Sequence, residues 1–133
     1  MTRLFVCLLI ASLAAFALPN NAAAAADCTD RASLPATPDG EAVAAVGFAY
    51  IRSIDNGSQQ TFWVQVAVDV PDGTQLLVFA NGGDPAGTIT IALGAGTLML
   101  SSPLPAGLAE VCEIGRIWVT DVEETTTLID GSF

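Results

Sequence analysis

Residues 60–70 alternate between two sets of side chains, and this period of two is typical of a β-strand with one buried face. The set expected to face the interior consists of Phe62, Val64, Val66, Val68 and Val70. An α-helix would scatter these side chains around its axis, because it repeats every 3.6 residues. The run therefore predicts a sheet whose apolar face packs against a second layer.

Turn-forming residues divide the rest of the chain into further short runs of this kind. Asp55-Asn56-Gly57-Ser58 indicates a hairpin, and Pro71-Asp72-Gly73 indicates a second turn. The predicted strands cover residues 41–54, 60–70, 74–80, 88–93, 97–102, 115–122 and 126–133. About seven strands without helical periodicity favour an all-β fold, an antiparallel β-sandwich, over residues 41–133. A small closed β-barrel is the alternative, and residues 104–112 have room for one helical turn.

The first 26 residues have the pattern of a secretory signal peptide. Arg3 precedes an apolar run over residues 4–18, and the alanines of residues 22–26 offer cleavage sites. The apolar run is shorter than the roughly 20 residues that a membrane-spanning helix needs. We therefore expect a secreted or periplasmic protein without an integral membrane span after signal cleavage. The cleaved chain would begin with a loose lead-in segment, residues 27–40.

Cys28 and Cys112 are the two cysteines that lie outside the signal peptide. An isolated pair in an exported chain is expected to be oxidised, because the compartments outside the cytosol permit disulfides. The sequence contains no Cys-x-x-Cys motif of the kind found in redox enzymes. We therefore predict a structural Cys28–Cys112 disulfide.

The sequence contains no histidine and no lysine. The commonest general base, the commonest metal ligand and the Schiff-base amine are therefore absent, which argues against an ordinary catalytic triad. Fourteen acidic residues against four basic ones give a net charge of −10. A surface this acidic repels phosphate backbones, so nucleic acid is not expected as a partner. We expect a protein that is not an enzyme.

Carboxylate clusters are the remaining source of chemistry. Most of them lie in or beside predicted turns, where acidic side chains usually serve the turn or the solvent. The densest group is Asp121, Glu123 and Glu124. Calcium is the one metal that such oxygen ligands favour, but their spacing matches no EF-hand loop. No catalytic residue, metal site or cofactor is therefore predicted, and calcium is left open.

Two turns set strand registers that predict an apolar outer face. A hairpin centred on Asn56-Gly57 places Tyr50 opposite Trp63. A second hairpin, centred on Asp72-Gly73, would extend the same face along the next strand. The predicted ligand or partner face consists of Phe48, Tyr50, Trp63, Leu76 and Val78. This face is more apolar than exposure to solvent requires, which indicates a contact surface.

Three interpretations of this face are open. The N-terminal segment around Leu34-Pro35 would cover it, held in place by the disulfide. Another protein chain, or a second copy of this one, would pack against it. Sugar rings would stack on its aromatic side chains, with Arg52, Gln65 and Gln75 as polar partners. The sequence therefore favours a non-enzymatic surface, adhesion or assembly accessory module, and a carbohydrate-binding module is the alternative.

A series of short segments resembles a known class of domains. These segments are residues 47–51, 60–66, 71–74, 81–83 and 87–91, followed by Ile117-Trp118-Val119-Thr120-Asp121 and a terminal Gly131-Ser132-Phe133. Together they resemble small exported bacterial β-sandwich domains of unknown function. The resemblance covers residues 47–133, implies the fold and transfers no catalytic residue. Trp118 and the cysteine pair have no place in that pattern.

Overall fold

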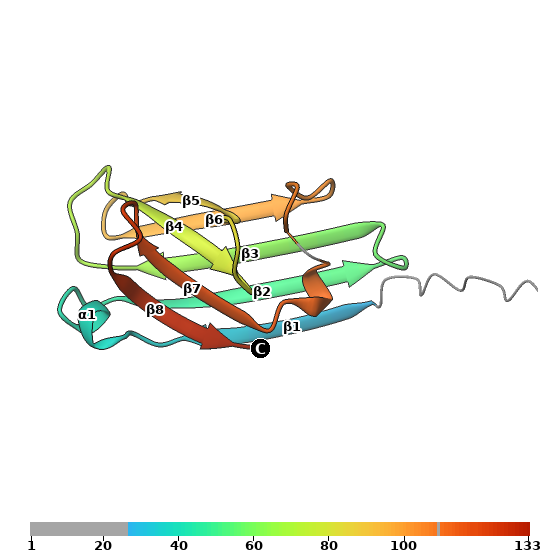
Figure 1. Cartoon of the computed structure of the whole chain (residues 1–133), viewed down its shortest axis with the longest axis horizontal. Helices are drawn as coiled ribbons and strands as arrows, with labels where there is room; N and C mark the ends of the chain where they lie inside the picture. Colours follow the sequence, from blue (N-terminus) through green and yellow to red (C-terminus); the bar gives the residue numbers. More distant parts are fainter. Residues whose placement is uncertain (1–26, 109) are drawn as a thin grey trace, which may run out of the picture.

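The computed structural model describes residues 27–108 and 110–133, which fold into two four-stranded antiparallel sheets (Figure 1). Sheet 1 has the order β1-β2-β3-β6, with bounds Cys28–Leu34, Val46–Ile54, Gln59–Ala67 and Ala95–Ser101. Sheet 2 has the order β5-β4-β7-β8, with bounds Gly87–Thr90, Gln75–Ala80, Arg116–Asp121 and Thr127–Ser132. The sheets do not close into a barrel, so the prediction of an antiparallel β-sandwich is confirmed.

Two short helical elements complete the described part of the chain. Helix α1 (Pro38–Glu41) follows β1, and the 3-10 helix η1 (Val111–Glu113) precedes β7. The second overlaps the end of residues 104–112, where the sequence left room for a helical turn. Within the described ranges, no helix has the length and hydrophobicity needed to cross a membrane. The predicted signal peptide lies outside the described residues.

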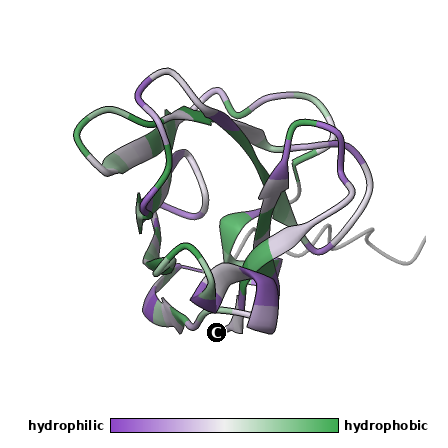
Figure 2. Ribbon diagram, turned by 90° about the vertical axis from the view of Figure 1, so that its left-hand side faces the viewer, coloured by the Kyte–Doolittle hydropathy of each residue, from purple (hydrophilic) through white to green (hydrophobic). Residues whose placement is uncertain are grey.

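The core lies between the two sheets and follows from the alternation of side chains along each strand. Phe62, Val64 and Val66 of β3 are fully buried, as their period of two predicts. Sheet 2 contributes fully buried partners such as Val78 and Ile117. Figure 2 looks along the molecule and shows the two sheets on opposite sides of this interior. Each sheet therefore has an inner face in the core and an outer face directed away from it.

The N-terminal segment is not a loose lead-in, because residues 28–34 form strand β1 at the edge of sheet 1. Its buried side chains are Ala32 and Leu34, at 6% and 0% exposure. Two small or medium apolar residues followed by Pro35 are too short a pattern to indicate a strand. Beyond β1, the backbone N–H of Asp130 donates to the carbonyl of Pro35 at 3.1 Å. This contact joins the edges of the two sheets.

The first predicted hairpin is confirmed. Strands β2 and β3 pair with Tyr50 opposite Trp63 and Ile51 opposite Phe62. Asn56 in the connecting turn has a positive φ of 56°, a conformation that asparagine tolerates better than most residues. The turn therefore sets the register that brings Tyr50 and Trp63 to the same outer face.

The second predicted hairpin is wrong, because β3 and β4 lie in different sheets. Residues 68–74 cross from one sheet to the other, and the Gly73 N–H donates to the carbonyl of Ile91 at 2.7 Å. The free side of β3 pairs with β6, which places Met99 opposite Trp63. The turn at Asp72-Gly73 bends the chain without pairing the strands on either side of it.

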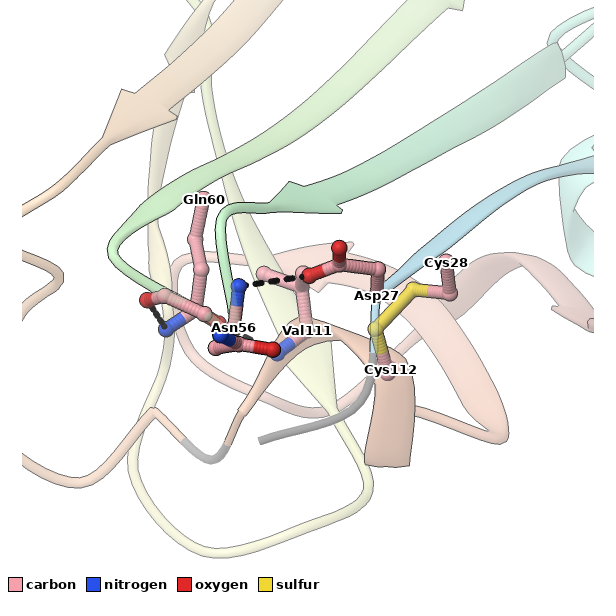
Figure 3. The surroundings of a disulfide bond; sticks show 7 residues. Asp27, Cys28, Asn56, Gln60, Val111 and Cys112 are labelled. Atoms are coloured by element: carbon pink, nitrogen blue, oxygen red, sulfur yellow. Dashed lines mark hydrogen bonds between the residues drawn. A yellow bond between two sulfur atoms is a disulfide. The ribbon is translucent and has the colours of Figure 1, made fainter. Parts of the chain in front are cut away.

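The predicted disulfide between Cys28 and Cys112 is confirmed (Figure 3). It joins the first residue of β1 to η1, with a Cα–Cα distance of 5.8 Å. Beside it, the backbone N–H of Val111 donates to Oε1 of Gln60 on β3 at 2.9 Å. The long connection between β6 and β7 is therefore fastened both to the edge of sheet 1 and to its central hairpin.

Candidate functional site on the outer face of sheet 1

The structure divides the predicted partner face between two places. Phe48, Tyr50 and Trp63 lie together on the outer face of sheet 1, on β2 and β3. Leu76 and Val78 lie on β4 of sheet 2 and are 1% and 0% exposed, so this part of the prediction is wrong. The reason is the crossing before β4, which turns these two side chains into the core.

The edge strands of sheet 1 add two residues that sequence reasoning missed. Strand β1 places Arg31 opposite Tyr50, and β6 places Met99 opposite Trp63. One side chain from each strand therefore contributes to a row across the sheet, in the order Arg31, Tyr50, Trp63, Met99. Because β1 and β6 are far apart in the sequence, no local pattern could have indicated this row.

We call this surface the aromatic face. It consists of Arg31, Val46, Phe48, Tyr50, Arg52, Trp63, Gln65 and Met99. Val46, Phe48 and Met99 are 55%, 38% and 67% exposed, which marks an apolar patch in contact with solvent. The interpretation that the segment around Leu34 covers this face is wrong, because Leu34 is fully buried in the core and β1 lies beside β2.

Phe48 divides the aromatic face into two shallow hollows. Its ring meets that of Trp63 edge-on, with centroids 5.0 Å apart and an angle of 89° between the planes. The Arg31 hollow has a volume of about 250 Å³ and is lined by Arg31, Phe48, Tyr50 and Trp63. The Gln65 hollow has a volume of about 200 Å³ and is lined by Val46, Gly47, Phe48, Gln65 and Ala67. The perpendicular rings mean that Phe48 and Trp63 do not form one flat platform.

Each hollow contains a polar side chain. The guanidinium carbon of Arg31 lies 5.6 Å from the centroid of the Tyr50 ring, within the range of a cation–π contact. Gln65 brings an amide, which both donates and accepts hydrogen bonds, to the second hollow. Gln75, the third polar partner suggested by the sequence, lies on β4 in the other sheet and is not part of this surface.

The aromatic face is positively charged in an otherwise acidic protein. Among the described residues, the outward-facing positions of β1, β2, β3 and β6 include Arg31 and Arg52 but no Asp or Glu. Arg116, the third arginine of the described ranges, lies on sheet 2 and pairs with Asp130 at 2.5 Å. The net charge of the whole chain is −10. Two arginines therefore lie where the sheet presents no acidic side chain.

Sheet 2 has an aromatic cluster of its own, whose members contact one another. Trp118 stacks on Phe79, with centroids 5.3 Å apart and an angle of 4° between the planes. The guanidinium carbon of Arg116 lies 4.7 Å from the centroid of the Trp118 ring. Phe79 is only 5% exposed. This stack stabilises sheet 2, and its Phe79 ring is buried whereas Phe48 of the aromatic face is 38% exposed.

The Arg116–Asp130 pair makes stability depend on pH. Its hydrogen bond lowers the pKa of Asp130 and raises the pKa of Arg116. A carboxyl group whose pKa is lowered by folding stabilises the protein above its unfolded pKa, and this contribution disappears as the pH falls. Asp130→Asn should therefore slightly lower the thermal midpoint at pH 7, and the difference from the wild type should shrink as the pH falls from about 4 towards 2. Thermal melts that differ equally at all pH values would contradict this.

A larger hollow lies beside the β2–β3 turn, but local hydrogen bonds occupy the polar groups of Gln60 and Ser102 that line it. It has a volume of about 510 Å³, and its lining includes Gly57, Gln60 and Ser102. Gln60 Nε2 donates to the carbonyl of Gly57 at 3.1 Å, and Ser102 Oγ accepts from the backbone N–H of Gln60 at 2.8 Å. These side chains hold the end of the sandwich together.

The predicted cluster of Asp121, Glu123 and Glu124 lies at the turn between β7 and β8. Asp121 accepts hydrogen bonds from the backbone N–H and the hydroxyl of Thr125, at 2.8 and 2.7 Å. Across the described part of the chain, no group of three or more His, Cys, Asp or Glu side chains is placed to hold a metal ion. In this arrangement Asp121 serves its own turn.

Comparison with known proteins gives no family assignment. No protein-family model matches the chain, and no curated protein matches it. Inferences about function therefore rest on the geometry and charge of the aromatic face.

Proposed function

We propose that this protein is an exported, non-enzymatic β-sandwich module that acts through its aromatic face, as an adhesion or assembly accessory. The observation that carries the proposal is an exposed aromatic patch with two arginines and no acidic side chain, in a chain of net charge −10. Exposed apolar patches of this kind commonly bind other molecules. The acidic remainder of the surface disfavours non-specific contact with nucleic acid or anionic membranes.

Export is supported by two separate features. Residues 1–26 have the composition of a signal peptide. The Cys28–Cys112 disulfide is compatible with an oxidising compartment such as the periplasm or the extracellular space. The absence of histidine and lysine from the sequence supports a role in binding over one in catalysis.

Binding to cell envelopes tests this proposal. Residues 27–133 should cosediment with envelopes of the organism that produces the protein, and Trp63→Ala should weaken the binding at least about tenfold, as expected for a central aromatic residue of an interface. Val122→Ala is the matched control, because Val122 is 52% exposed but lies in the turn between β7 and β8. Equal binding of Trp63→Ala and the wild type would contradict a role for the aromatic face, as would a wild type that neither cosediments nor self-associates.

A further inference from the structure

We infer that the ligand of the aromatic face is an acidic glycan, with one carboxylated sugar ring in the Arg31 hollow. This inference rests on the proposed function and specifies the ligand class. It combines the charge of the face, the size of its hollows and the chemistry of the side chains that line them.

The charge of the face favours an anionic ligand. Arg31 and Arg52 project from neighbouring strands on the same side of sheet 1. Charges further away than about 8 Å are largely screened at physiological ionic strength, so distant carboxylates of the acidic chain have little effect on a ligand at the face. Asp30 alternates to the opposite side of β1, but its Oδ1 accepts a hydrogen bond from the backbone N–H of Arg31 at 2.8 Å and offsets part of the positive charge. A carboxylate is therefore attracted here although the protein as a whole is acidic.

The hollows match single rings. Their volumes of about 250 and 200 Å³ lie below the range of about 300–1,000 Å³ of pockets that enclose drug-sized ligands. Phe48 forms a wall of both, so two consecutive rings of a chain would lie on either side of it. The C–H face of a sugar ring is apolar and weakly positive, which suits contact with the negative face of an aromatic ring.

The polar side chains provide the hydrogen bonds that such a ligand needs. Arg31 lies over Tyr50 at the end of the first hollow, and a guanidinium group binds a carboxylate through two parallel hydrogen bonds. Gln65 in the second hollow both donates to and accepts from sugar hydroxyl groups. A carboxylated ring in the Arg31 hollow, followed by a neutral ring in the Gln65 hollow, therefore matches the side chains that line them.

The face suits a glycan better than a protein partner. A bound peptide would gain most from backbone pairing at a sheet edge, and the aromatic face offers side chains only. A second copy would also bring the arginines of both faces together if the same faces met.

Nuclear magnetic resonance titration of ¹⁵N-labelled residues 27–133 tests the inference. The probes are an oligogalacturonate, a hyaluronate oligosaccharide, the fully methyl-esterified oligogalacturonate and a hexaglutamate peptide. The esterified probe keeps the sugar rings but removes their charge. At least one acidic glycan should shift the indole N–H signal of Trp63 and leave that of Trp118 in place. It should bind at least about tenfold more tightly than the ester, and more weakly as salt is added.

Two arginine variants test whether Arg31 is the residue that binds the carboxylate of the ligand. Arg31→Gln should weaken binding of the acidic glycan about tenfold or more, because it removes a charge-assisted hydrogen bond. Arg116→Gln changes the net charge equally but lies on sheet 2, so binding should be unchanged. Thermal melts establish that both variants are folded. Equal losses in the two variants would overturn the assignment of the carboxylate to Arg31.

Other outcomes separate this inference from the proposed function. Equal affinity for the ester, or equal affinity for hexaglutamate, would overturn the acidic-glycan assignment and leave the aromatic face as a binding surface. No binding to either acidic glycan would also overturn it, while Trp63-dependent cosedimentation with envelopes would still support the proposed function. Shifts confined to Trp118 would overturn the placement of the ligand on sheet 1.

Discussion

Phe62→Ala is expected to lower the free energy of unfolding by about 3–5 kcal/mol, because it removes a fully buried ring from the centre of the core. The next residue, Trp63, points to the opposite side of the same strand. Its replacement by alanine removes the edge-on contact with Phe48, worth about 0.5–1.5 kcal/mol beyond the area that the half-buried ring buries, and should cost less than Phe62→Ala. Urea titrations of the two variants measure this difference directly.

The comparison depends on these adjacent residues having opposite roles. If Trp63→Ala were as costly as Phe62→Ala, the indole would be a structural element, and loss of binding in Trp63→Ala would only report unfolding. If Trp63→Ala unfolds cooperatively with little loss of stability, the binding experiments on this variant report the surface alone. Far-UV circular dichroism of both variants should show unchanged strand content under native conditions.

Removing the disulfide is the second large expected effect. The double variant Cys28→Ser/Cys112→Ser should lose about 2–5 kcal/mol of stability, because the bond closes a loop between residues 84 positions apart and restricts the unfolded chain. Urea titration of the variant and of the oxidised wild type provides the measurement. Strand content should be unchanged, because β1 is also paired with β2 along its whole length.

A control separates the crosslink from the serine substitutions. The wild type unfolded in the presence of a reducing agent should match the double variant in stability. An oxidised wild type no more stable than the double variant would contradict the account. It would mean that pairing of β1 and the hydrogen bond from Val111 to Gln60 hold this end of the sandwich without the disulfide.

The first hairpin was predictable because its turn chemistry and its strand pattern agree. Residues 55–58 favour a tight turn, and a tight turn allows few registers. The pairing of Tyr50 with Trp63 follows from that register. The alternation over residues 60–70 also identified Phe62, Val64 and Val66 as core residues, since a period of two leaves only one strongly apolar set.

The second half of the register prediction failed for a physical reason. Both sets of side chains in β4 contain large apolar residues, so alternation alone does not tell which set faces inward. Turn residues such as Asp72-Gly73 occur in hairpins and in crossings between sheets alike. The structure uses a crossing, and this buries Leu76 and Val78. Topology at this point depends on how the two sheets pack, which no local segment specifies.

The aromatic face was predictable only in its centre. Phe48, Tyr50 and Trp63 lie on two strands joined by a short turn, so local rules bring them together. Arg31 and Met99 come from β1 and β6, which reach the face through pairings between distant parts of the chain. The positive charge of the face depends in part on Arg31, so it could not be predicted without knowing the pairing of β1 with β2.

The central claim, that the protein acts through its aromatic face, is tested most directly by the oxidation of Met99. Met99 is the only methionine of residues 27–133, and it is 67% exposed at the end of the Arg31-Tyr50-Trp63 row. Hydrogen peroxide should convert it rapidly to the sulfoxide in the free protein. In protein bound to cell envelopes, mass spectrometry should show oxidation slowed several-fold. Oxidation at the same rate in bound and free protein would mean that the Met99 end of the row stays uncovered, and, together with envelope binding that Trp63→Ala leaves unchanged, it would contradict the claim.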